Sequence, residues 1–338
     1  MGRGGKSATR PEGYPSLVSG VNRMTAVDDV LQPFEIENHS AQGRLVKLGN
    51  SLHQILTAHD YPSEVAALLG ELQVVAALMS GTLKFDGVLS IQVKGDGPIN
   101  MLLVDVTTDG HMRGYAKFNK DKLSLVSINC GDIPQQQVPR LLGAGYFALT
   151  VDQGSETQPY QGVVALEGAT LTDCAHAYLR QSAQLDAALK VCVGNVEGIE
   201  GSSWRGGGVM VQKSSFSGFQ HIDGEATDSE FEDAWRRIVA FLGSCTNDEI
   251  LDVCLHPHDL LFRLFSEDGV RVFDPSFFIM KCRCSRERVQ NVLISFPREE
   301  VNSMKIGDDV VVTCEFCNTN YRFDTNYIDA IFNTSTCS

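Results

Sequence analysis

The pattern of apolar residues predicts one long helix in the first quarter of the chain. Between Ser63 and Ser80, apolar residues recur at steps of three and four, the spacing that places side chains on one face of an α-helix. Pro62 stands directly before this segment. The apolar stripe consists of Val65, Leu68, Leu69, Leu72, Val75, Ala76 and Met79. We therefore expect a helix from Ser63 to Ser80 with this stripe buried.

Alternating apolar and polar residues predict strands after this helix. Leu89, Ile91 and Val93 alternate with polar neighbours, and a glycine-rich turn at 95–98 separates them from an apolar run at 101–106. This arrangement predicts a β-hairpin. Further strands are expected at 114–118, 146–152, 162–166, 189–193 and 208–212, together with a helix at 172–182.

The character of the sequence changes after this region. Residues 213–228 are rich in Ser, Gly and polar side chains, which is typical of a linker. A second helix is expected over 248–265. Before it, another helix is expected to carry on one face Phe231, Trp235, Ile238, Val239 and Leu242. Periodicity leaves two interpretations of these helices open: ordinary packing between domains, or an apolar cover that can be displaced.

Length and composition indicate a soluble globular protein of about two domains. The chain has 338 residues, of which 43% are hydrophobic and 21% charged, and no apolar run approaches the roughly 20 residues of a membrane-spanning helix. Residues 1–30 lack the continuous apolar core of a secretory signal and are expected to form a disordered extension. The net charge of −14 repels phosphate backbones, so nucleic acid is not an expected partner.

Four of the ten cysteines form a metal-binding pattern. Without an export signal, ten cysteines indicate a reducing compartment, the cytoplasm, where clustered thiols bind metals or sense redox state. Cys-x-Cys and Cys-x-x-Cys pairs, separated by 29 residues, are made by Cys282, Cys284, Cys314 and Cys317. Small buried apolar side chains are expected at Cys130, Cys174, Cys192, Cys245 and Cys254. Cys337 is expected to be a free thiol.

This spacing predicts one zinc ion per chain. Two close pairs of cysteines can meet at a tetrahedral point, where four thiolates bind Zn²⁺ at about 2.3 Å. A closed shell of four sulfurs leaves no position for water or substrate, so the ion is expected to be structural or switching and not catalytic. The expected fold class is α+β: a mixed α/β body at 31–213, a linker with amphipathic helices at 214–276, and a small zinc-binding subdomain at 277–338.

Two weaker motifs receive structural interpretations. Residues 143–148 match GxGxxA, but a strand and not a helix is expected to follow, which is wrong for a dinucleotide site. His256 and His258 flank Pro257, and the start of a helix explains them better than metal binding does. No catalytic motif emerges, so no active site is assigned.

The chain resembles the heat shock protein 33 family, also called the 33 kDa chaperonin. The C-terminal segments 281–288 and 314–318 carry the strongest likeness, through the CxC and CxxC pairs. Supporting blocks lie in the body at 59–62, 83–87, 95–98, 113–116 and 160–164. The likeness extends over about residues 34–332.

This resemblance implies a redox-regulated, ATP-independent holding chaperone and not an enzyme. The family pattern implies inactivity in the reduced, zinc-bound state. It also implies activation by oxidation, through disulfides joining Cys282 to Cys284 and Cys314 to Cys317, with zinc release and unfolding of the switch. Unfolding client proteins are the implied partners during oxidative stress, with a homodimer formed on activation and no nucleotide bound. The apolar residues at 231–242 named above are the candidate client surface.

Two other functions remain open. An enzyme of unknown reaction carrying a structural zinc module would keep its metal and be unaffected by oxidation. A nucleic-acid-binding zinc module is disfavoured, because six basic and six acidic residues balance between 281 and 317.

Overall fold

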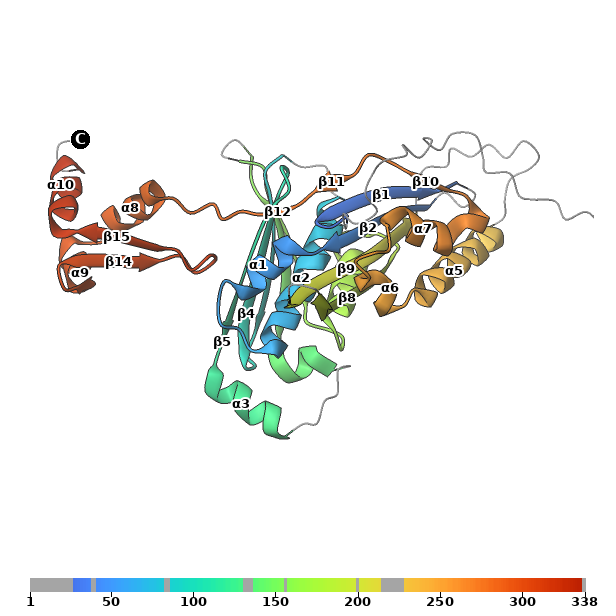
Figure 1. Ribbon diagram of the computed structural model, residues 1–338, viewed down its shortest axis with the longest axis horizontal. Helices are drawn as coiled ribbons and strands as arrows, with labels where there is room; N and C mark the ends of the chain where they lie inside the picture. Colours follow the sequence, from blue (N-terminus) through green and yellow to red (C-terminus); the bar gives the residue numbers. More distant parts are fainter. Residues whose placement is uncertain are drawn as a thin grey trace, which may run out of the picture.

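The computed structural model describes residues 27–37, 41–81, 86–129, 136–154, 157–198, 201–213 and 228–335. The described chain forms a large body and a small C-terminal module joined by a single extended segment (Figure 1). Residues 1–26 of the expected N-terminal extension lie outside the described residues. So do Cys130, Cys337 and residues 214–227 of the linker.

The first of two large sheets lies on one side of the body. Strand β1 (Val30–Ile36) pairs antiparallel with β2 (Ala41–Leu48), which continues to β9 (Gly201–Lys213) and β8 (Ala187–Gly198). Two short strands from much later in the chain, β10 (Val270–Val272) and β11 (Ser276–Phe277), add to the other side of β1. This sheet therefore brings the first strand of the body, β1, together with strands that follow the linker helices, β10 and β11.

The second sheet contains the predicted hairpin. Its order is β12 (Ile279–Met280), β5 (His111–Phe118), β4 (Ile99–Thr107), β3 (Val88–Gly95), β6 (Gly145–Asp152) and β7 (Tyr160–Ala165). Antiparallel pairing of β3 with β4 confirms the hairpin, and β6 confirms that residues 143–148 lead into a strand. Only the β12–β5 pair of this sheet is parallel.

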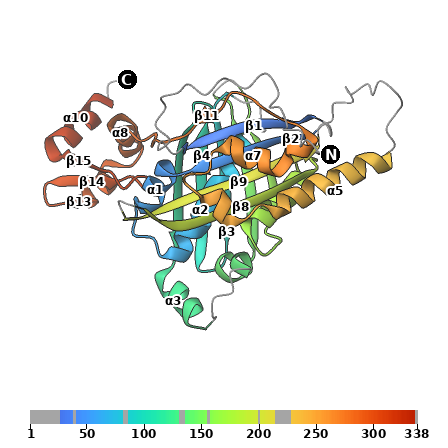
Figure 2. The ribbon, with the colours of Figure 1, turned by 45° about the vertical axis from the view of Figure 1, so that its right-hand side comes forward.

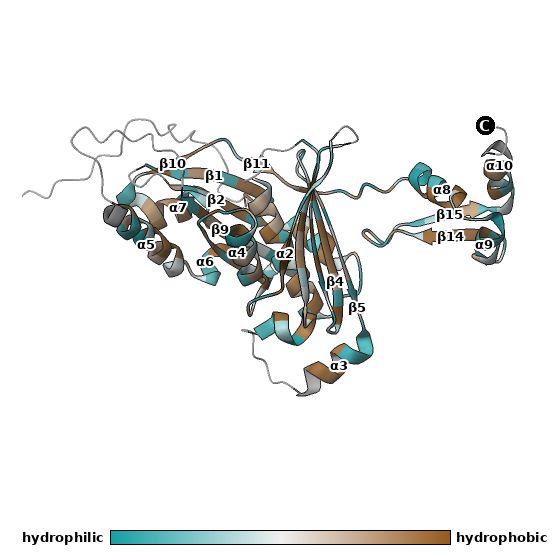
Figure 3. Ribbon diagram, turned by 180° about the vertical axis from the view of Figure 1, so that it is seen from behind, coloured by the Kyte–Doolittle hydropathy of each residue, from teal (hydrophilic) through white to brown (hydrophobic). Residues whose placement is uncertain are grey.

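Helix α2 (Ser63–Ser80) has the predicted bounds and lies between the two sheets. It contacts β2, β8 and β9 of the first sheet and β3, β4 and β5 of the second. Its length and composition would allow it to cross a membrane, but 72% of it is buried in the body. Burial extends beyond the predicted stripe to Val74 and Leu78, because a helix between two sheets has apolar surroundings on nearly all sides. The strands on either side of α2 also consist largely of hydrophobic residues (Figure 3).

Shorter helices complete the body. Helix α4 (Leu171–Gln181) agrees with the prediction at 172–182 and begins with a capping box formed by Thr170 and Asp173. The others are α1 (Asn50–Thr57), α3 (Lys120–Asn129) and the π-helical turn η3 (Val138–Leu142).

Linker helices α5 (Asp228–Ser244), α6 (Asn247–Leu251) and α7 (Pro257–Phe265) pack on the outer face of the first sheet (Figure 2). The prediction of one helix over 248–265 is wrong, because the chain leaves the helical conformation at Asp252 and restarts at Pro257. A proline lacks the amide that an uninterrupted helix would need there. The 3₁₀ turn η4 (Ser266–Asp268) follows α7.

Helix α5 divides the predicted apolar stripe. Ile238 and Leu242 are buried against the first sheet, and Trp235 is partly buried beside them. Phe231 is 52% exposed and Val239 37% exposed, so only part of the apolar face predicted for this helix is buried. Neighbouring residues of a helix point about 100° apart. Because the sheet covers the side on which Ile238 lies, its neighbour Val239 remains exposed.

The C-terminal module has a small core of its own. It contains α8 (Arg286–Ile294), α9 (Arg298–Ser303), β13 (Lys305–Ile306), β14 (Asp309–Thr313), β15 (Asn320–Asp324) and α10 (Thr325–Ser335). Six buried apolar residues form the centre: Leu293, Val301, Val310, Phe323, Ile328 and Ile331. A unit of this size buries little apolar surface and needs further stabilisation.

Phe265 tests how firmly the linker helices are held. Its ring is fully buried and stacks on Phe34 of β1 at 5.7 Å between ring centroids. We expect Phe265→Ala to lower the free energy of unfolding by about 3–5 kcal/mol in urea denaturation, because it removes a buried ring and leaves a cavity. Phe262→Ala on the same helix is the control. Its side chain is 57% exposed, and a change of less than about 0.5 kcal/mol is expected.

Candidate metal centre

Two short segments of the module carry the four cysteines. Cys282 and Cys284 lie in the extended chain between β12 and α8, and Ser285 caps α8 by accepting a hydrogen bond from the amide of Arg288. The helix thus begins directly after the second cysteine. Cys314 and Cys317 lie in the loop between β14 and β15. Pairing of these two strands closes that loop opposite the first segment.

The four sulfur atoms form a compact cluster. All lie within 4.8 Å of one another, with 3.7 Å between the Sγ atoms of Cys282 and Cys314 and 3.4 Å between those of Cys284 and Cys317. A tetrahedral ion with metal–sulfur bonds of about 2.3 Å requires sulfur separations of about 3.8 Å. The cluster therefore fits a metal ion with four thiolate ligands. The rest of the described chain contains no comparable group of His, Cys, Asp and Glu.

The backbone shapes the Cys314–Cys317 loop. The amide of Cys314 donates to the carbonyl of Thr319, and the amide of Asn318 donates to the carbonyl of Cys314, each at 2.9 Å. Asn318 has a φ angle of 57°, the left-handed conformation that Asn adopts more readily than most residues. This tight turn brings Cys314 and Cys317 to the same side of the loop.

Hydrogen bonds around the cluster set the ionisation of its thiols. Burial raises the pKa of Cys284 to about 12, while the Tyr321 hydroxyl, which donates to its sulfur at 3.1 Å, acts in the opposite direction. Desolvation also raises the pKa of Cys314. It acts the same way on Cys317, but hydrogen bonding with the side chain and main chain of Thr319 and with the neighbouring thiols lowers its pKa to about 7. The cluster thus favours one thiolate near neutral pH, and metal binding displaces the remaining protons.

An arginine inside the CxC pair connects the cluster to the body. The Nη2 atom of Arg283 lies 2.6 Å from Oδ2 of Asp105 on β4, and Arg113 on β5 contacts the same oxygen at 2.6 Å. Ser90 donates to the other oxygen at 2.6 Å. The Asp105 side chain is only 5% exposed, so removing one arginine would leave a buried charge less well compensated.

The loop inside the CxxC pair also docks on the body. The guanidinium carbon of Arg113 lies 3.8 Å from the centre of the Phe316 ring, and Tyr115 lies beside that ring at 6.2 Å between centroids. His59 donates from Nε2 to the carbonyl of Glu315 at 2.8 Å. The docking residues of the module, Arg283, Glu315 and Phe316, therefore all lie between cysteines of the cluster.

The remaining cysteines are not part of the cluster. Cys174 and Cys245 are buried as predicted, and Cys192 is partly buried. Burial raises the pKa of Cys174 to about 12 and that of Cys192 to about 11, which makes both thiols poor nucleophiles. Cys254 is exposed, so the expectation of burial is wrong there: it lies in the break between α6 and α7.

The two histidines have structural roles, as interpreted from the sequence. His256 caps α7 by accepting from the amide of His258, and Nε2 of His258 lies 3.0 Å from Oε1 of Gln32. The sequence interpretation did not identify the docking residues Asp105, Arg113, Tyr115, Phe316 and Arg283. Four of them stand inside the cysteine pairs or the 113–116 block, but nothing in the sequence indicates that these distant segments meet.

Fold and site together define a class of protein: an α+β body with a four-cysteine, metal-binding module docked on it. The chain belongs to the Hsp33 family, a family of chaperones, since the family model described as Hsp33 protein matches residues 29–324. Relatives named 33 kDa chaperonin agree with this assignment.

The similarity to these relatives extends over nearly their whole length. The relative from Caulobacter vibrioides is 40% identical over 299 residues, which is 88% of this chain and 95% of the relative. The relative from Pseudomonas fluorescens is 34% identical over 306 residues, covering 90% and 93%. A crystal structure of the 33 kDa chaperonin from Thermotoga maritima shares the fold, with a TM-score of 0.74 and 21% identity, covering 92% of this chain and 99% of that chain.

Single cysteine substitutions test the metal site. We expect the purified protein to lose its bound metal on dialysis when any ligand is changed, because a closed tetrahedral shell needs four donors. The variants are Cys282→Ser, Cys284→Ser, Cys314→Ser and Cys317→Ser, and elemental mass spectrometry gives the metal content. Cys254→Ser should keep the metal content of the natural chain. Equal metal in all five variants would contradict the assignment.

Phe316→Ala tests the docking of the module. Loss of a ring contact worth about 1–2 kcal/mol should raise the undocked fraction about 5- to 30-fold. Tryptic cleavage after Lys281 or Arg283 should then accelerate, while the four cysteines keep their metal. Phe296→Ala is the matched control, a partly exposed ring elsewhere in the module. Unchanged cleavage in Phe316→Ala would show that the ring does not hold the module in place.

Proposed function

We propose that this protein is an ATP-independent holding chaperone that oxidation switches on. The observation that carries the proposal is the dual role of the cysteine segments. They supply the four clustered sulfurs, and they place Arg283 and Phe316 on the body. Whatever changes the bonding of the sulfurs changes the docking surface with it.

In the reduced state, the four thiolates hold one zinc ion per chain. Four sulfur donors at tetrahedral spacing and no histidine in the cluster favour zinc among the divalent metals. Bound zinc keeps the thiols deprotonated, the form that oxidants attack. The module is then folded, and the chaperone is inactive.

Oxidation by a peroxide joins the sulfurs in pairs. One thiolate attacks hydrogen peroxide, which forms a sulfenic acid and releases hydroxide; a second thiol then attacks the sulfenic sulfur, and water leaves as the disulfide forms. Each disulfide consumes one peroxide. We propose the pairs Cys282–Cys284 and Cys314–Cys317. All four sulfurs lie within 4.8 Å of one another, so small movements permit this pairing, and mapping of disulfide-linked peptides distinguishes it from Cys282–Cys314 with Cys284–Cys317.

Disulfide formation unfolds the module. Sulfurs in a disulfide lie about 2.05 Å apart, and they no longer serve as ligands for zinc. Metal binding to structural zinc sites is worth about 10–16 kcal/mol, which is more than a core of six apolar side chains can replace. The Cys314–Cys317 loop changes shape, and Phe316 and Arg283 leave Arg113 and Asp105.

The linker helices then supply client-binding surface. The candidate residues are Phe231, Trp235, Ile238, Val239 and Leu242 on α5. Phe231 and Val239 are already exposed, and Ile238 and Leu242 would become available when α5 leaves the first sheet. The sheet face beneath them, including Phe34, Ile36, Val209 and Val211, would add an apolar patch.

The partners proposed are unfolding proteins of the cytoplasm during oxidative stress, and a second copy of the chain in the active state. Binding without a chemical reaction needs neither a catalytic site nor a nucleotide. The acidic net charge disfavours nucleic acid as a ligand.

Light scattering tests the switch directly. A heated client protein should aggregate freely beside the reduced, zinc-loaded chain and be kept in solution by the chain treated with peroxide at mild heat. A chromophoric chelator should detect about one zinc released per chain. The Cys254→Ser variant should switch like the natural chain, since Cys254 lies outside the cluster.

Two results would contradict this function. Zinc retained after oxidation, with aggregation unaffected, would make the cluster a structural site on a body of different activity. Equal suppression of aggregation before and after oxidation would make the chain a chaperone without this switch.

A further inference from the structure

The segment that joins the linker helices to the metal module runs along the edges of both body sheets. We call residues 270–280 the strap. Its first strands, β10 and β11, pair with β1, with Val272 opposite Phe34 and Phe277 opposite Val30. Its last strand, β12, pairs with β5, with Ile279 beside His111. The strap therefore covers edge strands of two different sheets in succession (Figures 1 and 2).

Main-chain hydrogen bonds attach the strap to these edges. Amides of Phe273, Phe278 and Ile279 donate to the carbonyls of Pro33, Asp29 and Gly110 at 3.0, 2.7 and 3.0 Å. By contrast, four of its large apolar side chains point away from the body and are between 37% and 60% exposed: Val272, Phe273, Phe277 and Ile279. An attachment of this kind depends little on which side chains the bound strand carries.

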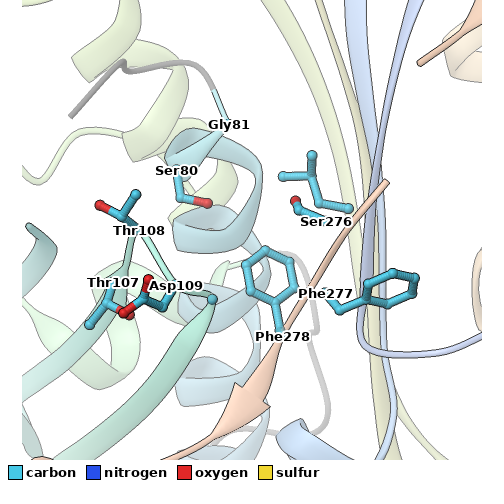
Figure 4. Close-up of a pocket in the computed structure, with 10 residues that line it drawn as sticks. Ser80, Gly81, Thr107, Thr108, Asp109, Ser276, Phe277 and Phe278 are labelled. Carbon is cyan, nitrogen blue, oxygen red and sulfur yellow. The ribbon is translucent and has the colours of Figure 1, made fainter. Parts of the chain in front are cut away.

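A cavity lies beneath the point where the strap passes from one sheet to the other. It measures about 290 Å³ and is lined by the end of α2, the 107–110 turn and Phe278. Phe278 points towards Ser80 and this turn, whereas Phe277 points to the opposite side (Figure 4). Gly110 has a φ angle of 77°, and a Cβ atom there would overlap the carbonyl oxygen of Phe277. The crossing point thus admits an extended main chain at close range, with a cavity beside it.

The strap ends at the metal centre. Lys281 donates from its amide to the carbonyl of Met112 at 3.0 Å, and Cys282 is the next residue. The metal-bound module therefore holds the C-terminal end of the strap against β5. Once the module is released, β12 is held by its main-chain bonds, by the partly buried Met280 side chain and by Phe278 just before it.

We propose that the β1 and β5 edges are strand-addition sites for extended, apolar segments of client proteins, which the strap occupies until oxidation releases it. This inference rests on the proposed function. An uncovered strand edge pairs readily with any extended chain, and main-chain amides and carbonyls are the groups that all unfolded proteins share. The segment that occupies these edges in this structure itself carries Val272, Phe273, Phe277 and Ile279, so a client segment of similar apolar composition is expected.

Hydrogen exchange of the natural chain, followed by mass spectrometry, tests where the client binds. Peptides spanning β1 and β5 should be protected in the reduced chain and should exchange at least about tenfold faster after oxidation. Adding a thermally unfolded client to the oxidised chain should restore their protection.

The outcomes separate this inference from the function on which it rests. If the oxidised chain suppresses aggregation while both edges continue to exchange rapidly, the holdase function stands and the strand-addition site is wrong. If it suppresses no aggregation, the proposed function itself fails. Protection that appears without client and increases with chain concentration would assign the edges to a second copy of the chain and overturn the inference.

A matched pair of variants tests the main-chain contact in the reduced, metal-loaded chain. Ile279→Pro removes the amide that donates to Gly110, whereas Ile279→Ala removes the exposed side chain and keeps the amide. A short fluorescent apolar peptide should bind the proline variant at least about tenfold more tightly than the natural chain, since the strap competes less well for the edge. The alanine variant should bind the peptide as the natural chain does.

The same peptide with every main-chain amide methylated is the control for strand pairing. It keeps the side chains but cannot donate the main-chain hydrogen bonds of a strand, so it should bind none of the three chains. Equal binding of the two peptides to the proline variant would overturn the inference in favour of side-chain recognition. Metal content measured on each variant verifies that the module itself is intact.

Discussion

The buried carboxylate of Asp105 joins the two parts of this protein. It contacts Arg113 from the body and Arg283 from the module through one oxygen, and Ser90 through the other. A carboxylate this deeply buried needs its partners, because an uncompensated charge in the interior is costly. Since Arg283 stands between Cys282 and Cys284, the position of the module depends on the same few residues as the geometry of the sulfur cluster. Phe316, between the other two cysteines, repeats this arrangement on the neighbouring surface of the body.

Stability is distributed unevenly along the chain. The body encloses α2 between two sheets, and the linker helices share a second core with the outer face of the first sheet. The module has a third and much smaller core, so it relies most on ligation of its cysteines. Opening the metal site would therefore remove the least stable part first. The effect would reach the body through the strap, which follows the linker helices and ends two residues before Cys282.

Membership of the Hsp33 family gives this arrangement a chaperone context. The relatives named 33 kDa chaperonin match this chain over more than nine-tenths of their own length, so body, linker and module all belong to the shared architecture. Within that architecture, the docking contacts described above connect the cysteine pairs to particular residues of the body. A holding chaperone must bind chains of unrelated sequence, and both exposed apolar surface and sheet edges are suited to that task.

The sequence alone determined the local features. The bounds of α2, the β3–β4 hairpin and the cysteine pairs follow from residues close together in the chain, where periodicity and spacing act directly. Sequence periodicity did not place Val239 outside the buried face of α5, because only the sheet beneath the helix decides which side is covered. It also gave no sign of the Arg283–Asp105 contact, between residues 178 positions apart. Such contacts arise when separate elements pack together, and only the tertiary structure brings their residues within reach.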